Sequence, residues 1–331
     1  MPADLDAAVN LSMLHFLQSR TGPIYRQLVA DELTQAINKV IPRRPDTELP
    51  STAEAAQLRT EGLVSLARLL TDDQVAELRA YFEKRPCLNG HTPDQSDRIP
   101  RLIGKGAEAF HYGCYTRHEA VAAPHLLELA NRPEILAIAE RYLGCVPTLY
   151  SLHAWWSFSG HGTAEYAQRY HRDFDDFRFC TLFLYLTDVG PRNGAHSFIR
   201  RSHRPEASEQ ILQMRAGRVR IGDRAATLPD LYSAFHSEQH DSMYEAVFDG
   251  FVETITGPAG FGFVADTSGL HKGLPLTEGR RLICSARYGL YRNVMAVNTG
   301  APPLPQMDRV GRDERRVYID RCLVCAPPKG G

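Results

Sequence analysis

The chain has 331 residues, of which 43% are hydrophobic and 23% are charged, a balance typical of folded globular proteins and unlike that of disordered chains. Its 38 basic and 39 acidic residues give a formal net charge of −1, so no overall field favours nucleic acid or an anionic membrane surface. No apolar run reaches the ~18 to 20 residues that a membrane-spanning helix needs. We therefore expect neither a nucleic-acid nor a membrane partner.

The cysteine pattern indicates a reducing compartment. The seven cysteines are odd in number and scattered, and the N-terminal residues do not resemble a secretory signal peptide. This predicts free thiols in a cytoplasmic protein. Cys322 and Cys325 form a C-x-x-C pair, but no second pair accompanies them, so the sequence does not predict a zinc site there.

The order of patterns along the chain predicts a single domain, residues 1–331. Within it we expect a peripheral helical segment, a helical and loop-rich support, a β-rich catalytic core with an insert, and a C-terminal tail; these span residues 1–60, 61–145, 146–295 with the insert at 204–250, and 296–331.

The N-terminal part predicts helices around one strand. Residues 25–40 carry apolar side chains at helical spacing, and a proline-bearing loop follows. Residues 62–70 are strand-like. Thr71 and Gln74 then form a capping-box pattern, which predicts the start of a second helix.

A polar segment and a further helix precede the β-rich part. Residues 86–118 are rich in Gly, Pro and Asp, which predicts a loop with short strands near 110–115. Residues 133–143 have the periodicity of an amphipathic helix. Asn131 is the predicted N-cap of this helix, and Gly144 is its predicted terminator.

From residue 146 onward, short β-rich segments dominate, and each is bounded by Gly, Pro, Asn or Asp. The segments are 146–158, 179–186, 252–256, 261–265 and 281–288. Strands without regular helices between them predict an antiparallel barrel or sandwich rather than a doubly wound parallel sheet.

A His-x-Asp triplet lies just before the second of these strands. Side chains of an extended chain alternate between faces, so His171 and Asp173 point the same way. A second histidine from a distant strand would complete the 2-His-1-carboxylate set that holds non-haem Fe(II). His271 is the candidate, because it follows a strand, a turn and another strand that would return the chain to the same end of a barrel.

Other interpretations of these residues stay open on the sequence alone. A His-x-Asp triplet is often only a surface histidine beside a solvated aspartate. Asp175 and Asp176 follow closely enough to replace Asp173 as a ligand, although the alternation of side chains favours Asp173. Arg281, about ten residues past His271, is placed to bind a dicarboxylate through a bidentate charge-assisted pair if it points inward.

Five segments, taken in order, resemble the phytanoyl-CoA dioxygenase family of Fe(II)/2-oxoglutarate oxygenases. They are YHRD, FLYLTDV, NGAHSFIRRSH, GPAGFGFVADTSGLHKG and RRLICSARY, and GLVSLARLLTDDQVAELRAYF resembles the usual N-terminal opening of that family. The resemblance implies a mainly β fold with flanking helices around a double-stranded β-helix, a jelly-roll core of the cupin-like kind. It also implies that His171, Asp173 and His271 bind iron.

The resemblance further implies Arg281 as the clamp for the C5 carboxylate of 2-oxoglutarate. Arg280 is the competing arginine, and Thr277 is a further hydroxyl donor to this co-substrate. The implied activity is that of a dioxygenase that uses O2 to hydroxylate a small molecule and releases succinate and CO2. The alternative is a cupin-like metal-binding or ligand-binding protein without oxygenase turnover.

Several neighbouring residues also have two interpretations. Where relatives often have Pro-Gly, this chain has Arg200-Arg201, and with other arginines nearby the pair predicts either an acidic-substrate patch or a solvated surface. We expect Trp155 and Trp156 to divide between the site and the core. Four further histidines flank the site, and we expect structural roles for them rather than ligation; they are His153, His161, His196 and His203.

Overall fold

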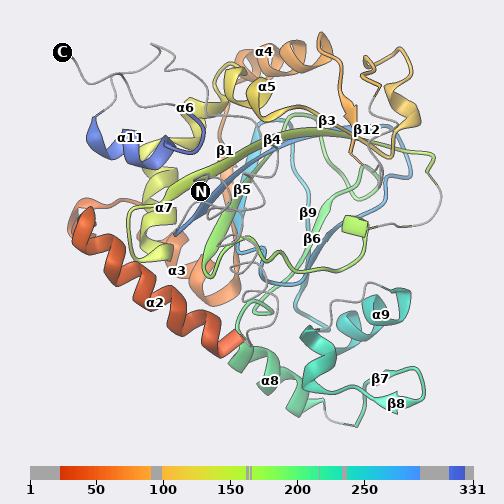
Figure 1. The fold of residues 1–331 in the computed structure, drawn as a ribbon. Coiled ribbons are helices and arrows are strands. Elements are labelled where there is room, and N and C mark those ends of the chain that lie inside the picture. The colour runs from red at the N-terminus through yellow and green to blue at the C-terminus, as the bar shows by residue number, and fades with distance from the viewer. Residues whose placement is uncertain are drawn as a thin grey trace, which may run out of the picture.

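Two antiparallel β-sheets lie at the centre of the molecule (Figure 1). The structure is a computed structural model, and it describes residues 23–90, 99–161, 164, 166–215, 217–232, 237–290 and 313–324. Within these residues, a seven-stranded sheet has the order β1-β10-β5-β12-β4-β3-β2, and a three-stranded sheet has the order β11-β6-β9. Every pairing between neighbouring strands of the two sheets is antiparallel.

The strands have the following bounds. The larger sheet contains β1 (Leu63–Arg68), β2 (Leu88–Asn89), β3 (Tyr112–Cys114), β4 (Thr148–Phe158), β5 (Phe179–Tyr185), β10 (Phe261–Ala265) and β12 (Arg280–Gly289). The smaller sheet contains β6 (His196–Ile199), β9 (Val252–Ile255) and β11 (His271–Gly273). A separate hairpin in the insert pairs β7 (Arg220–Ile221) with β8 (Arg224–Ala225).

The helices surround these sheets. The α-helices are α2 (Pro23–Val40), α3 (Thr52–Glu61), α4 (Asp72–Glu83), α5 (Arg117–Ala122), α6 (Leu126–Ala130), α7 (Pro133–Leu143), α8 (Pro205–Met214), α9 (Glu238–Val247) and α11 (Glu314–Asp320). Short 3₁₀ helices are η1 (Asp46–Glu48), η3 (Ala107–Ala109), η4 (Tyr166–Gln168) and η5 (Leu228–Tyr232).

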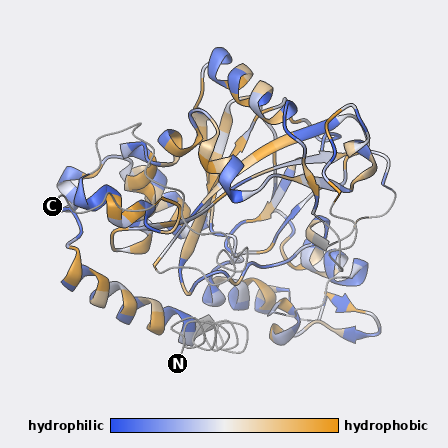
Figure 2. Ribbon diagram, turned by 45° about the horizontal axis from the view of Figure 1, so that its top comes forward, coloured by the Kyte–Doolittle hydropathy of each residue, from blue (hydrophilic) through white to orange (hydrophobic). Residues whose placement is uncertain are grey.

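The two faces of the larger sheet pack against different parts of the molecule. Along β12, Leu282 and Cys284 join an apolar cluster with the helices α3 to α7, whereas Ile283 joins Phe198 of β6 in a second cluster between the sheets. Successive side chains of a strand point to opposite faces, so one strand contributes to both clusters. Figure 2 shows the hydrophobic residues gathered on the central strands, with hydrophilic residues toward the periphery.

The predicted mainly β fold with flanking helices is confirmed. The predicted strands agree with β4, β5, β9, β10 and β12 to within two residues at each end. Trp156 lies fully buried in the outer cluster, where its Nε1 donates to the Tyr115 hydroxyl at 3.0 Å. Trp155 lies on the opposite, inner face beside the second cluster, so the two tryptophans lie on opposite faces of the sheet.

Helix ends confirm most of the capping predictions. Thr71 and Gln74 form the predicted capping box at α4, and Gly144, with a φ of 81°, ends α7. The prediction of Asn131 as the N-cap of α7 is wrong. Pro133 occupies the first helical position, which makes Arg132 the N-cap, and Asn131 instead caps the C-terminus of α6.

The polar segment at 86–118 is more ordered than its composition predicts. It contains the expected short strand β3, which pairs with β4 and with β2. At its end, Thr116 and Glu119 form a second capping box that starts α5, where the sequence analysis predicts only a loop. The sequence pattern T-x-x-E carries this signal, although no long apolar stripe follows it.

Three further observations bear on the sequence predictions. None of the described helices has the length and apolar character of a membrane span. The six cysteines in the described part of the chain, Cys322 among them, are free thiols. Cys325, residues 1–22 of the predicted N-terminal segment and most of the predicted tail lie outside the described residues.

Candidate metal centre

His171 and His271 lie directly opposite each other on antiparallel segments. The N–H of each residue donates to the C=O of the other, and both N···O distances are 3.0 Å. Directly opposed residues project their side chains from the same face, and the two ring centroids are 4.2 Å apart. Two residues on, the Asp173 N–H donates to the Thr267 carbonyl at 2.8 Å. The extended chain therefore places Asp173 on the same side as His171.

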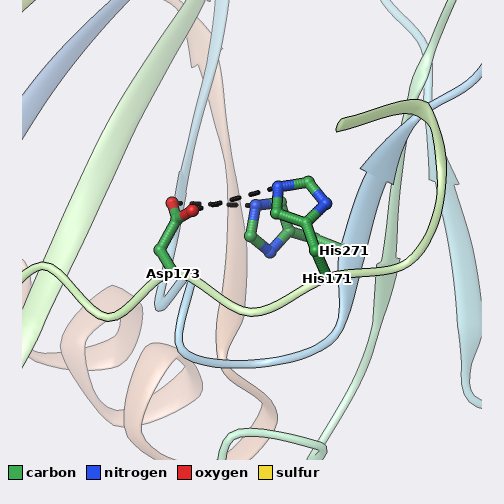
Figure 3. A group of neighbouring side chains, drawn as sticks. All are labelled: His171, Asp173 and His271. Carbon is green, nitrogen blue, oxygen red and sulfur yellow. Dashed lines mark ion pairs between the residues drawn. The ribbon is translucent and has the colours of Figure 1, made fainter. Parts of the chain in front are cut away.

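The three side chains converge on one point (Figure 3). Nε2 of His171 lies 3.9 Å from Oδ1 of Asp173, and Nε2 of His271 lies 3.8 Å from Oδ2 of Asp173. These separations are below twice the ~2.1 Å length of a bond from a transition metal to nitrogen or oxygen. One ion can therefore bind all three groups. His171 and Asp173 keep 17% of their side-chain surface exposed, so one side of the site is accessible.

Hydrogen bonds set the tautomers that metal binding requires. Nδ1 of His171 lies 2.9 Å from the Arg169 carbonyl, and Nδ1 of His271 lies 2.9 Å from the Gly269 carbonyl. A carbonyl oxygen only accepts, so each Nδ1 carries the proton and each Nε2 presents a lone pair toward Asp173. Such backbone contacts are typical of metal-binding histidines because they fix the ring orientation.

The charges at the site also suit a cation. Burial, and then the neighbouring His171, lower the pKa of His271 to about 3, so its ring is neutral at physiological pH. Burial opposes ionisation of Asp173, but Arg287 and the two histidines outweigh it and lower the pKa of Asp173 to about 2. With both rings neutral, the site offers two nitrogens and one carboxylate, a donor set that fits Fe(II).

Asp175 and Asp176, the alternative ligands, have other partners. The Asp175 carboxylate accepts from the Tyr150 hydroxyl at 3.1 Å and forms an ion pair with Arg287. The same guanidinium lies 3.4 Å from Oδ2 of Asp173. Asp176 accepts from the backbone N–H of Phe177 at 2.7 Å. Arg287 therefore holds Asp173 and Asp175 side by side, and only Asp173 faces the histidines.

Arg281 is a buried arginine on the inner face of the larger sheet. It lies opposite Ser157 of β4, donates from Nη2 to Ser157 Oγ at 3.1 Å and donates from Nη1 to the Gly194 carbonyl. Its Nε has no hydrogen-bond partner, and no described carboxylate forms an ion pair with it. Burial lowers the pKa of this guanidinium. A buried cation without an anionic partner is costly, which indicates a place for an anion beside Arg281.

The two other predicted co-substrate residues lie elsewhere. Arg280 precedes Arg281 on β12, so it points to the opposite face, where its guanidinium lies over the Trp156 ring and 3.4 Å from Glu83. Thr277 is exposed in the turn before β12, and its hydroxyl contacts the Arg192 carbonyl at 3.4 Å. The structure therefore does not bring Arg280 or Thr277 to the triad.

The flanking histidines differ in their environments. His196 is buried, its ring stacks on His271 with a centroid distance of 5.4 Å, and its Nε2 has no hydrogen-bond partner. His153 stacks on Trp155 on the inner face of β4, and burial together with the Arg287 charge lowers its pKa to about 4. His161 and His203 contact backbone carbonyls away from the triad.

Sequence reasoning did not single out Ser157, Ser285 and Arg287, which share the inner face of the larger sheet with Arg281. All three lie on β4 or β12 at an even spacing from other inner-face residues. Ser285 is buried, and its Oγ has no hydrogen-bond partner. Counting alternate positions from Arg281 along β12 would have identified Ser285 and Arg287. Ser157 needed the register between β4 and β12, which the sequence does not contain.

The Arg200-Arg201 pair is bound within the chain. Both guanidinium groups contact Glu61 at the end of α3, at 3.7 Å from Arg200 and 2.9 Å from Arg201. Arg201 has a φ of 67°, the left-handed region that favours glycine, and its N–H donates to the Glu61 carbonyl at 2.8 Å. Arg178 pairs with Asp31 at 2.5 Å. These contacts favour a role in holding the loop against helices over a role in an acidic-substrate patch.

An antiparallel β core that brings two histidines and one carboxylate to a point defines the cupin-like class of non-haem metal enzymes. The family model described as phytanoyl-CoA dioxygenase (PhyH) matches residues 58–236, and the chain belongs to this family of iron- and 2-oxoglutarate-dependent enzymes. The matched residues include His171 and Asp173; His271 and Arg281 lie beyond them.

Several solved structures are similar to the chain at low sequence identity. EctD from S. alaskensis with bound Fe has a TM-score of 0.50 and 16% identity, covering 85% of this chain and 87% of that chain. The epimerase SnoN from nogalamycin biosynthesis, in complex with Fe3+, alpha ketoglutarate and nogalamycin RO, has a TM-score of 0.45 and 19% identity, covering 71% and 82%. The carbocyclase SnoK from the same biosynthesis has a TM-score of 0.43 and 16% identity, covering 74% and 86%. No curated protein matches the chain.

These comparisons confirm the predicted jelly-roll fold and the predicted family. The cofactor prediction, Fe(II) with 2-oxoglutarate, is confirmed for the class of enzyme to which the chain belongs. Hydroxylation of a small molecule and the roles of the individual residues stay predictions.

Proposed function

We propose that the protein is an Fe(II)- and 2-oxoglutarate-dependent dioxygenase that hydroxylates a small-molecule substrate. One observation carries the proposal: the chain combines a convergent His171, Asp173 and His271 set with Arg281, a buried arginine of the inner face of β12 that has no anionic partner among the described residues. The metal set suits Fe(II), and the lone buried guanidinium suits a dicarboxylic acid. A metal-binding protein without turnover does not need a buried arginine that lacks an anionic partner.

In this proposal, iron with 2-oxoglutarate and O2 supplies the oxidising power for a C–H bond, so that substrate, 2-oxoglutarate and O2 yield hydroxylated product, succinate and CO2. His171, Asp173 and His271 would hold the iron, and the partly exposed side of His171 and Asp173 would admit the co-substrates. Arg287 holds the Asp173 carboxylate in its ionised form. Arg281 pairs with the distal carboxylate of the co-substrate. Within a single domain, residues 146–295 form the catalytic core.

The function is tested with purified protein, Fe(II) and 2-oxoglutarate. Without O2, we expect a weak visible charge-transfer band, and with O2 we expect succinate even in the absence of substrate. A metabolite library scored by succinate then identifies substrates, and a product heavier by one oxygen atom distinguishes hydroxylation from epimerisation or ring closure. A protein that binds metal but neither binds nor consumes 2-oxoglutarate would contradict the proposal and would instead be a cupin-like binding protein.

We further propose that His196 donates a hydrogen bond to the bound 2-oxo acid. Its Nε2 is buried without a partner, and the ring packs between His271 and Phe263. Burial, and then charges that include that of Arg281, lower the pKa of His196 well below its usual value, so the ring is neutral. The position of His196 beside a metal ligand and within electrostatic range of Arg281 supports a contact with an anion between them.

Replacing His196 with phenylalanine keeps a ring of similar shape and removes the donor. We expect the half-saturating concentration of 2-oxoglutarate in the succinate assay to rise by roughly 10-fold or more, the value of one hydrogen bond to a charged group. His161→Phe is the control, because the described contacts of that ring are with the Glu108 carbonyl and the His111 ring and not with the triad. An unchanged half-saturating concentration in His196→Phe would remove His196 from the co-substrate site.

A further inference from the structure

The residues on either side of the two histidines point away from the metal site and into the insert at 204–250. Tyr170 and Leu270 are buried in an apolar cluster with residues of α8, η5 and α9. The ring of Tyr170 meets that of Tyr244 edge to face, with centroids 6.2 Å apart. Because strand side chains alternate, the insert covers the back of the segments whose front carries the ligands.

One carboxylate of the insert contacts both of these segments. Asp241, on α9, accepts from the backbone N–H of Tyr170 at 2.9 Å through Oδ1 and from Nζ of Lys272 at 3.3 Å through Oδ2. Tyr170 immediately precedes His171, and Lys272 immediately follows His271. Nζ of Lys272 also lies 4.0 Å from the centre of the Tyr170 ring, which brings the two segments together a second time.

Arg172, between the ligands His171 and Asp173, makes a second attachment. Its Nη1 donates to the carbonyls of Ser202 at 2.7 Å and Ser268 at 2.8 Å, and its Nε and Nη2 donate to the Leu231 carbonyl of the insert. The guanidinium lies over the Tyr232 ring at 4.7 Å. Arg172 therefore ties the insert to the segment that follows β6 and to the segment that precedes β11. Its side chain points away from the metal site.

From these contacts we propose that the insert positions the metal ligands, and that Asp241 is the positioning residue through which it does so. The proposal rests on the proposed function, because it concerns the same metal. The Asp241 carboxylate fixes the separation of Tyr170 and Lys272. The backbone bridge between His171 and His271 then fixes the relative position of the two imidazole rings. The described contacts of the insert with these residues are on the back of the ligand segments, which is the position of a support and not of a lid.

This arrangement predicts coupling in both directions. If an ordered insert raises metal affinity, bound metal must stabilise the insert by the same factor, because coupling between two equilibria is reciprocal. Outer partners of metal ligands typically change metal affinity by about 10-fold to 100-fold. The measurable consequences are a metal affinity that depends on Asp241 and an α9 whose stability depends on metal.

The test uses the full chain and Co(II), which reports its coordination by visible absorption. Asp241→Asn leaves one oxygen to accept where two are needed, and we expect Co(II) to bind about 10-fold more weakly with an altered spectrum. Asp230→Asn is the matched control, since Asp230 is an insert carboxylate bonded to Arg224 and Thr227, both within the insert. We expect that control to lower the unfolding temperature while Co(II) affinity stays within about twofold of wild type, well below the roughly 10-fold effect expected for Asp241→Asn.

Hydrogen exchange provides the second readout. In wild type, Co(II) should slow amide exchange across residues 238–247, and this protection should be lost in Asp241→Asn. Should Asp241→Asn fail to fold, Lys272→Met tests the same bridge from its other end and keeps the apolar stem. No Co(II) binding by wild type would refute the proposed function; equal binding and equal protection in wild type and the variants would leave that function standing and overturn the role of Asp241.

Discussion

Replacing Asp173 with asparagine is expected to remove metal binding and succinate formation together. The amide has the same shape as the carboxylate but no negative charge to offset a divalent ion, and the two histidines alone provide only neutral donors. We expect metal affinity to fall by at least about 100-fold, the upper value seen when only an outer partner of a ligand is lost. Co(II) titration measures the affinity, and succinate formation with Fe(II), 2-oxoglutarate and O2 measures turnover.

The matched control is Asp175→Asn. Asp175 shares Arg287 with Asp173, yet its carboxylate faces Tyr150 and not the histidines. This variant should keep metal binding. If Asp175→Asn abolishes binding and Asp173→Asn does not, the carboxylate ligand is Asp175, and the alternation of side chains along this segment has been misread.

Replacing Arg281 with leucine should mainly affect 2-oxoglutarate. Two charge-assisted hydrogen bonds to one carboxylate are lost, each worth about 1.5–3 kcal/mol, so we expect the half-saturating concentration of 2-oxoglutarate to rise on the order of 10²-fold or more. Co(II) affinity should be little changed, because Arg281 contacts Ser157 and the Gly194 carbonyl and none of the three ligands. Succinate formation across a range of 2-oxoglutarate concentrations gives the value.

Arg280→Leu is the control for this substitution. The two arginines are adjacent in sequence, but Arg280 lies on the outer face beside Glu83 and Trp156. Its replacement should leave the requirement for 2-oxoglutarate unchanged. A second comparison uses 2-oxopentanoate, which has the same carbon chain without the distal carboxylate. Wild type should strongly prefer 2-oxoglutarate, and Arg281→Leu should lose most of that preference; a preference retained by Arg281→Leu would show that another group binds the carboxylate.

The sequence predicts those parts of the fold and site that depend on local patterns. Alternation of side chains placed His171 and Asp173 on one side, and turn residues bounded β5, β10 and β12 correctly. The step from His171 to His271 used the strand, turn and strand that return the chain and then the resemblance to a family, because no local pattern states which segments pair across a sheet. The resemblance implied Arg281 in preference to Arg280, and the burial of Arg281 agrees with that choice.

What the sequence did not predict depends on contacts between distant residues. Arg200 and Arg201 looked like a basic patch because Glu61, their partner, lies about 140 residues earlier. The sequence does not distinguish Asp241 from the other acidic residues, because its contact with Tyr170 depends on the packing of α9 behind the ligand segments. Thr277 was near Arg281 in sequence, but the turn before β12 carries it to the surface. Contacts of this kind between distant residues leave no signature in composition or periodicity.

Strand β12 has a consequence for how the protein tolerates mutation. Leu282, Cys284 and Ala286 pack under the helices, while Arg281, Ser285 and Arg287 lie on the inner face, where Arg287 pairs with Asp173. In a saturation mutagenesis scan scored separately for abundance and for turnover, the first set should lower abundance and the second should lower turnover at nearly normal abundance. From Arg281 to Arg287 the two scores would then alternate with a period of two, except at Ile283, an inner-face residue that packs in the apolar cluster between the sheets. Selection for stability and selection for catalytic turnover would thus act on alternate residues of one strand.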